Sequence, residues 1–136
     1  MQRYIDDGTL RLEWHDFPFL GEESRSAAVA ARAAQEQGKF WEYHDILYQN
    51  QSGENSGAFS EENLISFAQE AGLDVERFEA AIASGKYEEV VEKDFREAQD
   101  AGIQGTPSFN VNGQVIVGAQ PLETFARVIE AKAGNG

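Results

Sequence analysis

The sequence contains no cysteine among its 136 residues. This absence excludes disulfides, thiolate nucleophiles and thiolate metal ligands from the chemistry of the chain itself. Histidine is scarce too, because only His15 and His44 occur and neither has the companion residues of a metal site. We therefore predict no metal and no cofactor, and we name no catalytic residue.

Basic residues and long hydrophobic runs are also in short supply. Eleven Lys and Arg face 24 Asp and Glu, which gives a formal net charge of −13. Nucleic acid and anionic membranes are poor partners, because both attract clustered Lys and Arg. No run of about 18 apolar residues is present, and Met1–Asp7 lacks the apolar middle of a signal peptide. The chain as written is predicted to be cytoplasmic, whereas a longer parent would indicate the cell envelope or a periplasm-like compartment.

The remaining composition is that of a folded domain. Hydrophobic residues make up 41% of the chain and aromatic residues 11%. A chain of this length fits one domain that buries roughly 68% of the surface exposed by its unfolded state. We predict a single domain over residues 1–136.

Hydrophobic periodicity and the positions of Gly, Pro and Asn-Gly predict the order strand, several helices, hairpin, helix. Thr9–Phe17 alternates apolar and polar residues, which predicts a strand. Asn112-Gly113 between valine-rich segments predicts a hairpin with a type I′ turn. Pro121 is expected to open the last helix. The other helices are predicted over Glu22–Gln37, around Phe40–Tyr48, between Ser60 and Gly72, between Asp74 and Gly85, and from Tyr87 to Gly102. Ser60 and Asp74 are expected to cap the helices that follow them, and Gly38 is expected to end the first of these helices in the left-handed conformation.

The dense aromatic segment from Phe40 to Tyr48 allows two interpretations. Core packing is favoured for Phe40, Trp41 and Tyr48, and the alternative is that they line a peptide groove. His44 lies among these rings and is expected to form a core hydrogen bond. His15 alternates away from the apolar residues of its segment and is expected on a polar face.

Four stretches resemble the DsbA-like branch of the thioredoxin superfamily, the bacterial thiol:disulfide oxidoreductases and isomerases. They are Trp14–Phe19, the Ala-rich Ser26–Ala34, Gly38–Asp45 and Ile103–Phe109. The third is the most distinctive, because Gly-Lys-Phe-Trp-Glu-Tyr-His-Asp resembles the sequence at the start of that family's inserted helical domain. The resemblance extends over nearly the whole chain, from about Tyr4 to Lys132.

The resemblance implies an α/β, thioredoxin-like fold with an incomplete sheet. It implies a helical insertion over about residues 39–100 and a closing hairpin and helix over about residues 105–132. Pro107 corresponds to the family's cis-proline, and the backbone of the preceding residue, Thr106, corresponds to the group that pairs with an extended peptide substrate. The alternative is that this loop only orients the hairpin.

The chain departs from the family in lacking the Cys-x-x-Cys helix and the strand before it. We therefore expect a redox-inactive chain, and two interpretations remain. It is a fragment of an oxidoreductase whose thiols lie upstream, or it is a shortened, redox-silent relative that binds peptide or itself. A third, weaker interpretation is a glutathione-dependent isomerase-like relative with serine in place of the nucleophile, but that serine would also lie upstream.

The missing strand predicts the association state. It would lie between the Thr9–Asp16 strand and the strand at Pro107–Asn112, so its loss leaves unpaired edges that recruit other chains. We expect a homodimer, or an exchange of segments, that fills the gap.

Overall fold

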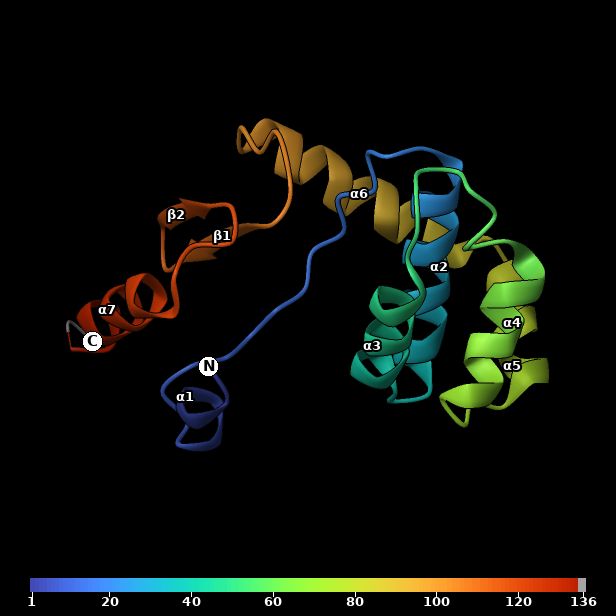
Figure 1. Ribbon diagram of the computed structural model, residues 1–136, viewed down its shortest axis with the longest axis horizontal. Coiled ribbons are helices and arrows are strands. Elements are labelled where there is room, and N and C mark those ends of the chain that lie inside the picture. Colours follow the sequence, from blue (N-terminus) through green and yellow to red (C-terminus); the bar gives the residue numbers. More distant parts are fainter. Residues whose placement is uncertain (135–136) are drawn as a thin grey trace. The chain divides into compact units, whose positions relative to one another are not determined.

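The computed structural model describes residues 1–134, so the last two residues of the predicted domain 1–136 lie outside the described part. The chain divides into two compact units (Figure 1). Unit 1 is built from Met1–His15 and Ala98–Gly136, and unit 2 is Asp16–Glu97. Unit 2 is therefore continuous in sequence, whereas unit 1 joins the two ends of the chain.

Unit 2 is helical. It contains α2 (Glu22–Glu36), α3 (Phe40–Asn50), α4 (Glu61–Glu70), α5 (Val75–Ala83) and most of α6 (Lys86–Asp100). Helix α2 packs against α3, α4 and α5. Its residues Ala30, Ala33 and Ala34 are fully buried. Because alanine side chains are small, three neighbouring helices can approach α2 closely.

Two aromatic residues occupy the centre of unit 2. Tyr43 on α3 and Phe78 on α5 are fully buried, and their ring centroids lie 5.5 Å apart. The Tyr43 hydroxyl donates a hydrogen bond to the carbonyl oxygen of Leu64 at 2.9 Å. This bond satisfies the one polar atom that the Tyr43 ring brings into the core.

The helix boundaries of unit 2 follow the predicted caps. The Ser60 hydroxyl accepts from the backbone N–H of Asn63, and the Asp74 carboxylate accepts from that of Arg77. Gly38 follows α2 with φ of 73°, in the left-handed region that favours glycine. These three local predictions are confirmed.

Unit 1 is a β-hairpin covered by a helix. Strand β1 (Ser108–Val111) pairs antiparallel with β2 (Gln114–Val117), and α7 (Leu122–Ala133) follows. Asn112 and Gly113 have φ of 45° and 87°, the left-handed values that a type I′ turn requires, so this turn prediction is confirmed. The core of the unit consists of Ile116, Phe125, Val128 and Ile129, with Tyr4, Leu10, Phe109 and Val111 packed against it.

The predicted strand over Thr9–Phe17 is wrong. Within residues 1–134 the sheet consists of β1 and β2, and the chain instead begins with a short helix, α1 (Gln2–Asp6). Leu10 packs against the core of unit 1, but Leu12 is exposed, so the expected apolar face is not formed. An alternating pattern makes a strand only where a neighbouring strand supplies hydrogen bonds.

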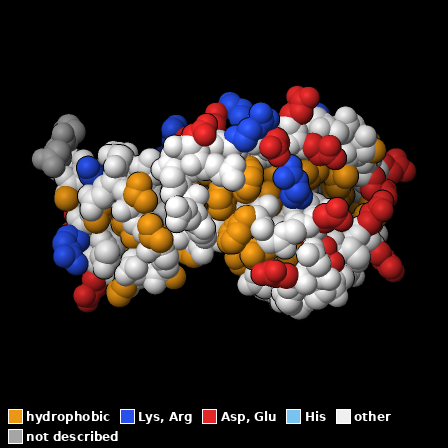
Figure 2. Space-filling view, turned by 90° about the horizontal axis from the view of Figure 1, so that it is seen from above, with side chains coloured by type: hydrophobic (Ala, Val, Ile, Leu, Met, Phe, Trp, Pro, Cys, Tyr) orange, Lys and Arg blue, Asp and Glu red, His pale blue; other side chains and the backbone are white. Residues whose placement is uncertain are grey.

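Acidic side chains dominate the surface of unit 2. Residues 16–97 contain 18 Asp and Glu and seven Lys and Arg, which accounts for −11 of the net charge of −13. On the face drawn in Figure 2, carboxylates are spread over this unit with hydrophobic side chains between them. The excess charge of the chain is thus concentrated in one unit.

Candidate functional site

The loop before β1 carries the two residues that the sequence singled out. Thr106 and Pro107 are both exposed, and the peptide bond between them is cis. The Pro107 carbonyl accepts a hydrogen bond from the N–H of Gly118 at 2.8 Å. The Ser108 hydroxyl donates to the carbonyl of Gly105 at 2.7 Å. Both ends of the loop are therefore held while Thr106 lies at the surface.

Strand β1 has an open edge next to this loop. Its only strand partner within residues 1–134 is β2. Backbone groups of successive residues in an antiparallel strand point alternately toward and away from the partner. Because Pro107 bonds to the residue after β2, the backbone groups of Ser108 and Asn110 are directed to the opposite, open side. This edge offers donors and acceptors for another extended chain.

The outward face of the hairpin is apolar on β2. Val115 and Val117 are 51% and 65% exposed, and both lie on the face opposite Ile116. The inward face packs on α7, where the rings of Phe109 and Phe125 meet edge to face with centroids 4.8 Å apart. The hairpin therefore presents an unpaired edge and an uncovered apolar strip together.

The two histidines belong to different units. His15 is exposed. His44 is half-buried on α3, its ring centroid is 4.5 Å from that of Tyr48, and its Nδ1 lies 2.9 Å from Oδ1 of Asp45. This contact of His44 is with an exposed neighbour. Among residues 1–134 no cluster of three or more His, Asp or Glu side chains is placed to hold a metal ion.

The prediction of core packing for the aromatic residues of α3 is confirmed only for Phe40. Phe40 is buried with Tyr43 and Leu47, whereas Trp41 and Tyr48 are 43% and 54% exposed. At 100° per residue, Trp41 and Tyr48 fall together on a side of the helix well away from the buried stripe. Helical geometry separates residues that composition alone groups together.

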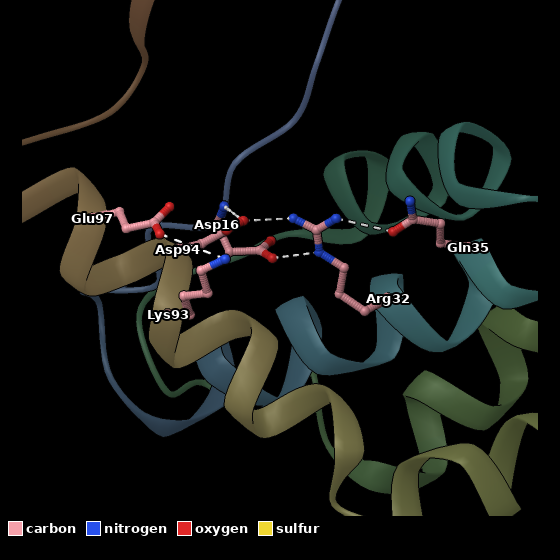
Figure 3. Close-up of polar contacts among 6 residues, drawn as sticks. All are labelled: Asp16, Arg32, Gln35, Lys93, Asp94 and Glu97. Carbon is pink, nitrogen blue, oxygen red and sulfur yellow. Dashed lines mark hydrogen bonds and ion pairs between the residues drawn. The ribbon is translucent and has the colours of Figure 1, made fainter.

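A buried ionic network in unit 2 was not anticipated from the sequence (Figure 3). Arg32 on α2 donates from Nε to Oδ2 of Asp16 at 2.6 Å and from Nη2 to Oδ2 of Asp94 at 2.7 Å. The backbone N–H of Asp16 also donates to Asp94, at 3.0 Å. The side chains of Asp16, Arg32 and Asp94 are 3%, 11% and 14% exposed. The network ties the segment before α2 to both α2 and α6.

The sequence offers little signal for this network. Arg32 interrupts the Ala-rich face of α2, which marks it as unusual, but its two partners lie 16 and 62 residues away. The network is fully hydrogen-bonded and contains no nucleophile, so we assign it a role in stabilising unit 2. The Thr106–Pro107 loop with the β1 edge is therefore the better candidate site.

The arrangement of a hairpin, a closing helix and a cis-proline loop, with a helical unit inserted in the chain, defines the thioredoxin-like class of folds. The family described as thioredoxin matches residues 1–131. The chain belongs to this family, in its DsbA-like branch, and the predicted fold class is confirmed.

Two relatives and one solved structure illustrate the similarity. A probable disulfide bond formation protein D from Bacillus cereus is 37% identical over 118 residues, which cover 84% of this chain and 55% of that protein. A Na(+)/H(+) antiporter NhaA from Herminiimonas arsenicoxydans is 40% identical over 105 residues, 77% of this chain but only 16% of the antiporter. A thioredoxin-like oxidoreductase from Silicibacter pomeroyi is 30% identical with a TM-score of 0.80, over 98% of this chain and 75% of that one.

The chain spans about half the length of the curated disulfide bond formation protein that it matches. Two of its relatives are probable disulfide bond formation proteins D, yet this chain has no sulfhydryl group. Thiol exchange proceeds by attack of a thiolate on a disulfide sulfur. The 136 residues themselves therefore supply no thiolate for this attack.

No helix of residues 1–134 combines the length and apolar composition needed to cross a bilayer.

Proposed function

We propose that this chain is the polypeptide-binding part of a DsbA-like protein and holds an extended protein segment at the open edge of β1. The observation that carries the proposal is the exposed edge beside Thr106 and Pro107, where the backbone groups of Ser108 and Asn110 are directed away from β2. Strand addition of this kind gains affinity from main-chain hydrogen bonds and needs no reactive side chain.

Thiol exchange on the bound segment would require cysteines from elsewhere. A longer parent chain would supply them upstream, and the segment held on β1 would then be the substrate of disulfide formation or isomerisation. Without such a parent, the chain is a binding module. Both forms use the same edge, so edge binding is the shared and testable part of the proposal.

A proline substitution at the edge tests this binding. Asn110→Pro removes a backbone N–H from the open side of β1 without removing a ladder bond to β2, and edge positions tolerate proline. Asn110→Ala is the matched control, because it loses the same side chain, including its bond to the N–H of Gly113, but keeps the backbone donor. The probe is a reduced, carboxymethylated insulin B chain, titrated by fluorescence anisotropy.

We expect Asn110→Pro to weaken binding at least fivefold relative to Asn110→Ala. Equal affinities of the two variants would remove the edge from the binding site. Circular dichroism on both variants shows whether the hairpin still folds.

Self-association through the same surface is the second candidate. Val115 and Val117 form an exposed apolar strip on the hairpin, and an open edge beside such a strip recruits further strands. A homodimer that pairs two β1 edges, or exchanges segments, would cover both. Size-exclusion chromatography with light scattering across micromolar concentrations tests this, and a monomer at every concentration contradicts it.

The compartment follows from the same alternatives. A parent that brings the thiols would work in the cell envelope, where disulfides persist. The chain as written, acting as a binding module, would stay in the cytoplasm. Cell fractionation of the natural protein, probed with an antibody against unit 2, separates the two.

A further inference from the structure

Unit 2 contains a cavity that the proposed function does not use. It has a volume of about 540 Å³ and lies among α2, α4, α5 and α6. Its apolar lining includes Val29, Leu64, Ile82 and Val91. Val29, Leu64 and Val91 belong to the buried core, whereas Ile82 is half-buried. Cavities of roughly 300 to 1,000 Å³ with predominantly apolar walls are typical of small-molecule sites.

The polar residues of the cavity are mostly anionic. Glu61 on α4, Glu79 on α5 and Glu88 on α6 line it, and all three are exposed at its rim. Among residues 1–134 none of these three carboxylates takes part in an ion pair. The one cation in the lining, Arg25, is paired with Glu92, and this hydrogen bond lowers the pKa of Glu92. The rim therefore has uncompensated negative charge.

We propose that this cavity binds an apolar organic cation, a small alkyl or aryl group that carries a single ammonium. The apolar body displaces water from the accessible side chains of Ile65, Ile82 and Ala83, while the ammonium lies at the rim near the three carboxylates. A carboxylate ligand of the same shape is repelled there, and a neutral ligand lacks the rim contacts. Charge complementarity thus selects the occupant.

The site is independent of the proposed edge binding. Every lining residue belongs to unit 2, whereas Thr106, Pro107 and β1 belong to unit 1. Failure of one proposal therefore leaves the other intact, and the two are measured with different probes.

The test is a methyl NMR titration of the full chain at low ionic strength. The probes are hexylammonium, 1-hexanol and hexanoate, which share one alkyl chain and differ in the charge of the head group. We expect shifts confined to the methyl groups that line the cavity, which are those of Val29, Leu64, Ile65, Ile82, Ala83 and Val91. We also expect hexylammonium to bind about tenfold more tightly than 1-hexanol, and hexanoate to bind more weakly than either.

Matched charge variants locate the ammonium. The double variant Glu79→Gln with Glu88→Gln neutralises two carboxylates at the rim. The control, Glu76→Gln with Glu89→Gln, neutralises two exposed carboxylates that lie on the same helices but do not line the cavity. One exposed ion pair strengthens binding by up to about fivefold. We expect the first pair to weaken hexylammonium binding about fivefold or more and to leave 1-hexanol unchanged, with little effect of the second pair.

A steric variant tests the cavity itself. Ala83 lines the cavity, lies at the end of α5 and is exposed, so Ala83→Trp can occlude the opening without entering the core. It is expected to abolish binding of hexylammonium and 1-hexanol while circular dichroism stays unchanged. The proposal is overturned by any of three results: shifts spread over the surface, equal weakening by both charge pairs, or hexanoate binding as tightly as hexylammonium.

Discussion

At the scale of single residues, Arg32 is expected to contribute most to the stability of unit 2. One guanidinium is shared by two carboxylates that are both nearly buried. Removing one member of a buried ion pair leaves an uncompensated charge and costs about 3–5 kcal/mol. We expect Arg32→Met to lower the free energy of unfolding by about that amount, measured by urea denaturation.

The matched control is Arg96→Met, which removes an exposed pairing with Glu92 one helical turn away. Exposed pairs of this kind contribute about 0.5 kcal/mol or less. Adding Asp16→Asn and Asp94→Asn to Arg32→Met should recover part of the loss, because the stranded charges are then removed. Equal effects of Arg32→Met and Arg96→Met would show that the buried network does not stabilise the unit.

Tyr43 makes the stability of unit 2 sensitive to alkaline pH. Burial raises the pKa of its hydroxyl above the value of about 10 found in unfolded chains. Because the folded state holds this proton more tightly, the stabilisation is fully present below about pH 10. It is lost as the pH rises from there toward the raised pKa of the folded state.

Tyr43→Phe tests this dependence. At neutral pH the variant should lose about 1 kcal/mol, because the carbonyl of Leu64 loses its donor. Between pH 10 and 11.5 the free energy of unfolding should fall less steeply than in the unchanged chain. Urea denaturation at a series of pH values measures both effects, and identical pH slopes would contradict the assignment.

At the scale of elements, Gly113 sets the hairpin turn. Its φ of 87° is unfavourable for a residue with a Cβ, although no neighbouring atom lies where the Cβ would be. We expect Gly113→Ala to destabilise the chain by about 1 kcal/mol through backbone strain alone. Gly53→Ala is the control, since that glycine has no positive φ and open space around it. Thermal unfolding compares them, and equal midpoints would contradict the role of the turn.

The elements show which signals a sequence contains. Ser60, Asp74 and Asn112-Gly113 were predictable because a cap or a tight turn is decided by residues a few positions apart. The segment Thr9–Phe17 has equally regular alternation, yet a strand also depends on a distant partner, and local patterning does not reveal one. Caps and tight turns, which have local causes, were predicted correctly, whereas the strand, which needs a distant partner, was predicted wrongly.

The site shows the same division. Thr106 and Pro107 could be named from a short motif, and the structure places them beside an exposed strand edge. The Asp16–Arg32–Asp94 network and the cavity of unit 2 could not be named, because each joins helices that are far apart in sequence. The exposure of Trp41 and Tyr48 depends on helical phase, which amino-acid composition does not reveal.

At the scale of the whole molecule, the chain combines a thioredoxin-family scaffold with the absence of that family's thiol. Most of its negative charge lies in unit 2, and the unpaired sheet edge lies in unit 1. Polypeptide binding at the edge depends on backbone hydrogen bonds rather than on charge. It should therefore persist as salt is raised.

The most direct test of the account is hydrogen exchange at the backbone amides of Ser108 and Asn110, measured by NMR with and without carboxymethylated insulin B chain at 0.2 M salt. Strand addition on β1 predicts that both amides exchange at least tenfold more slowly with the peptide present, while amides in α2 are unchanged. Unaltered exchange at Ser108 and Asn110 under saturating peptide would contradict the claim that this edge binds polypeptide.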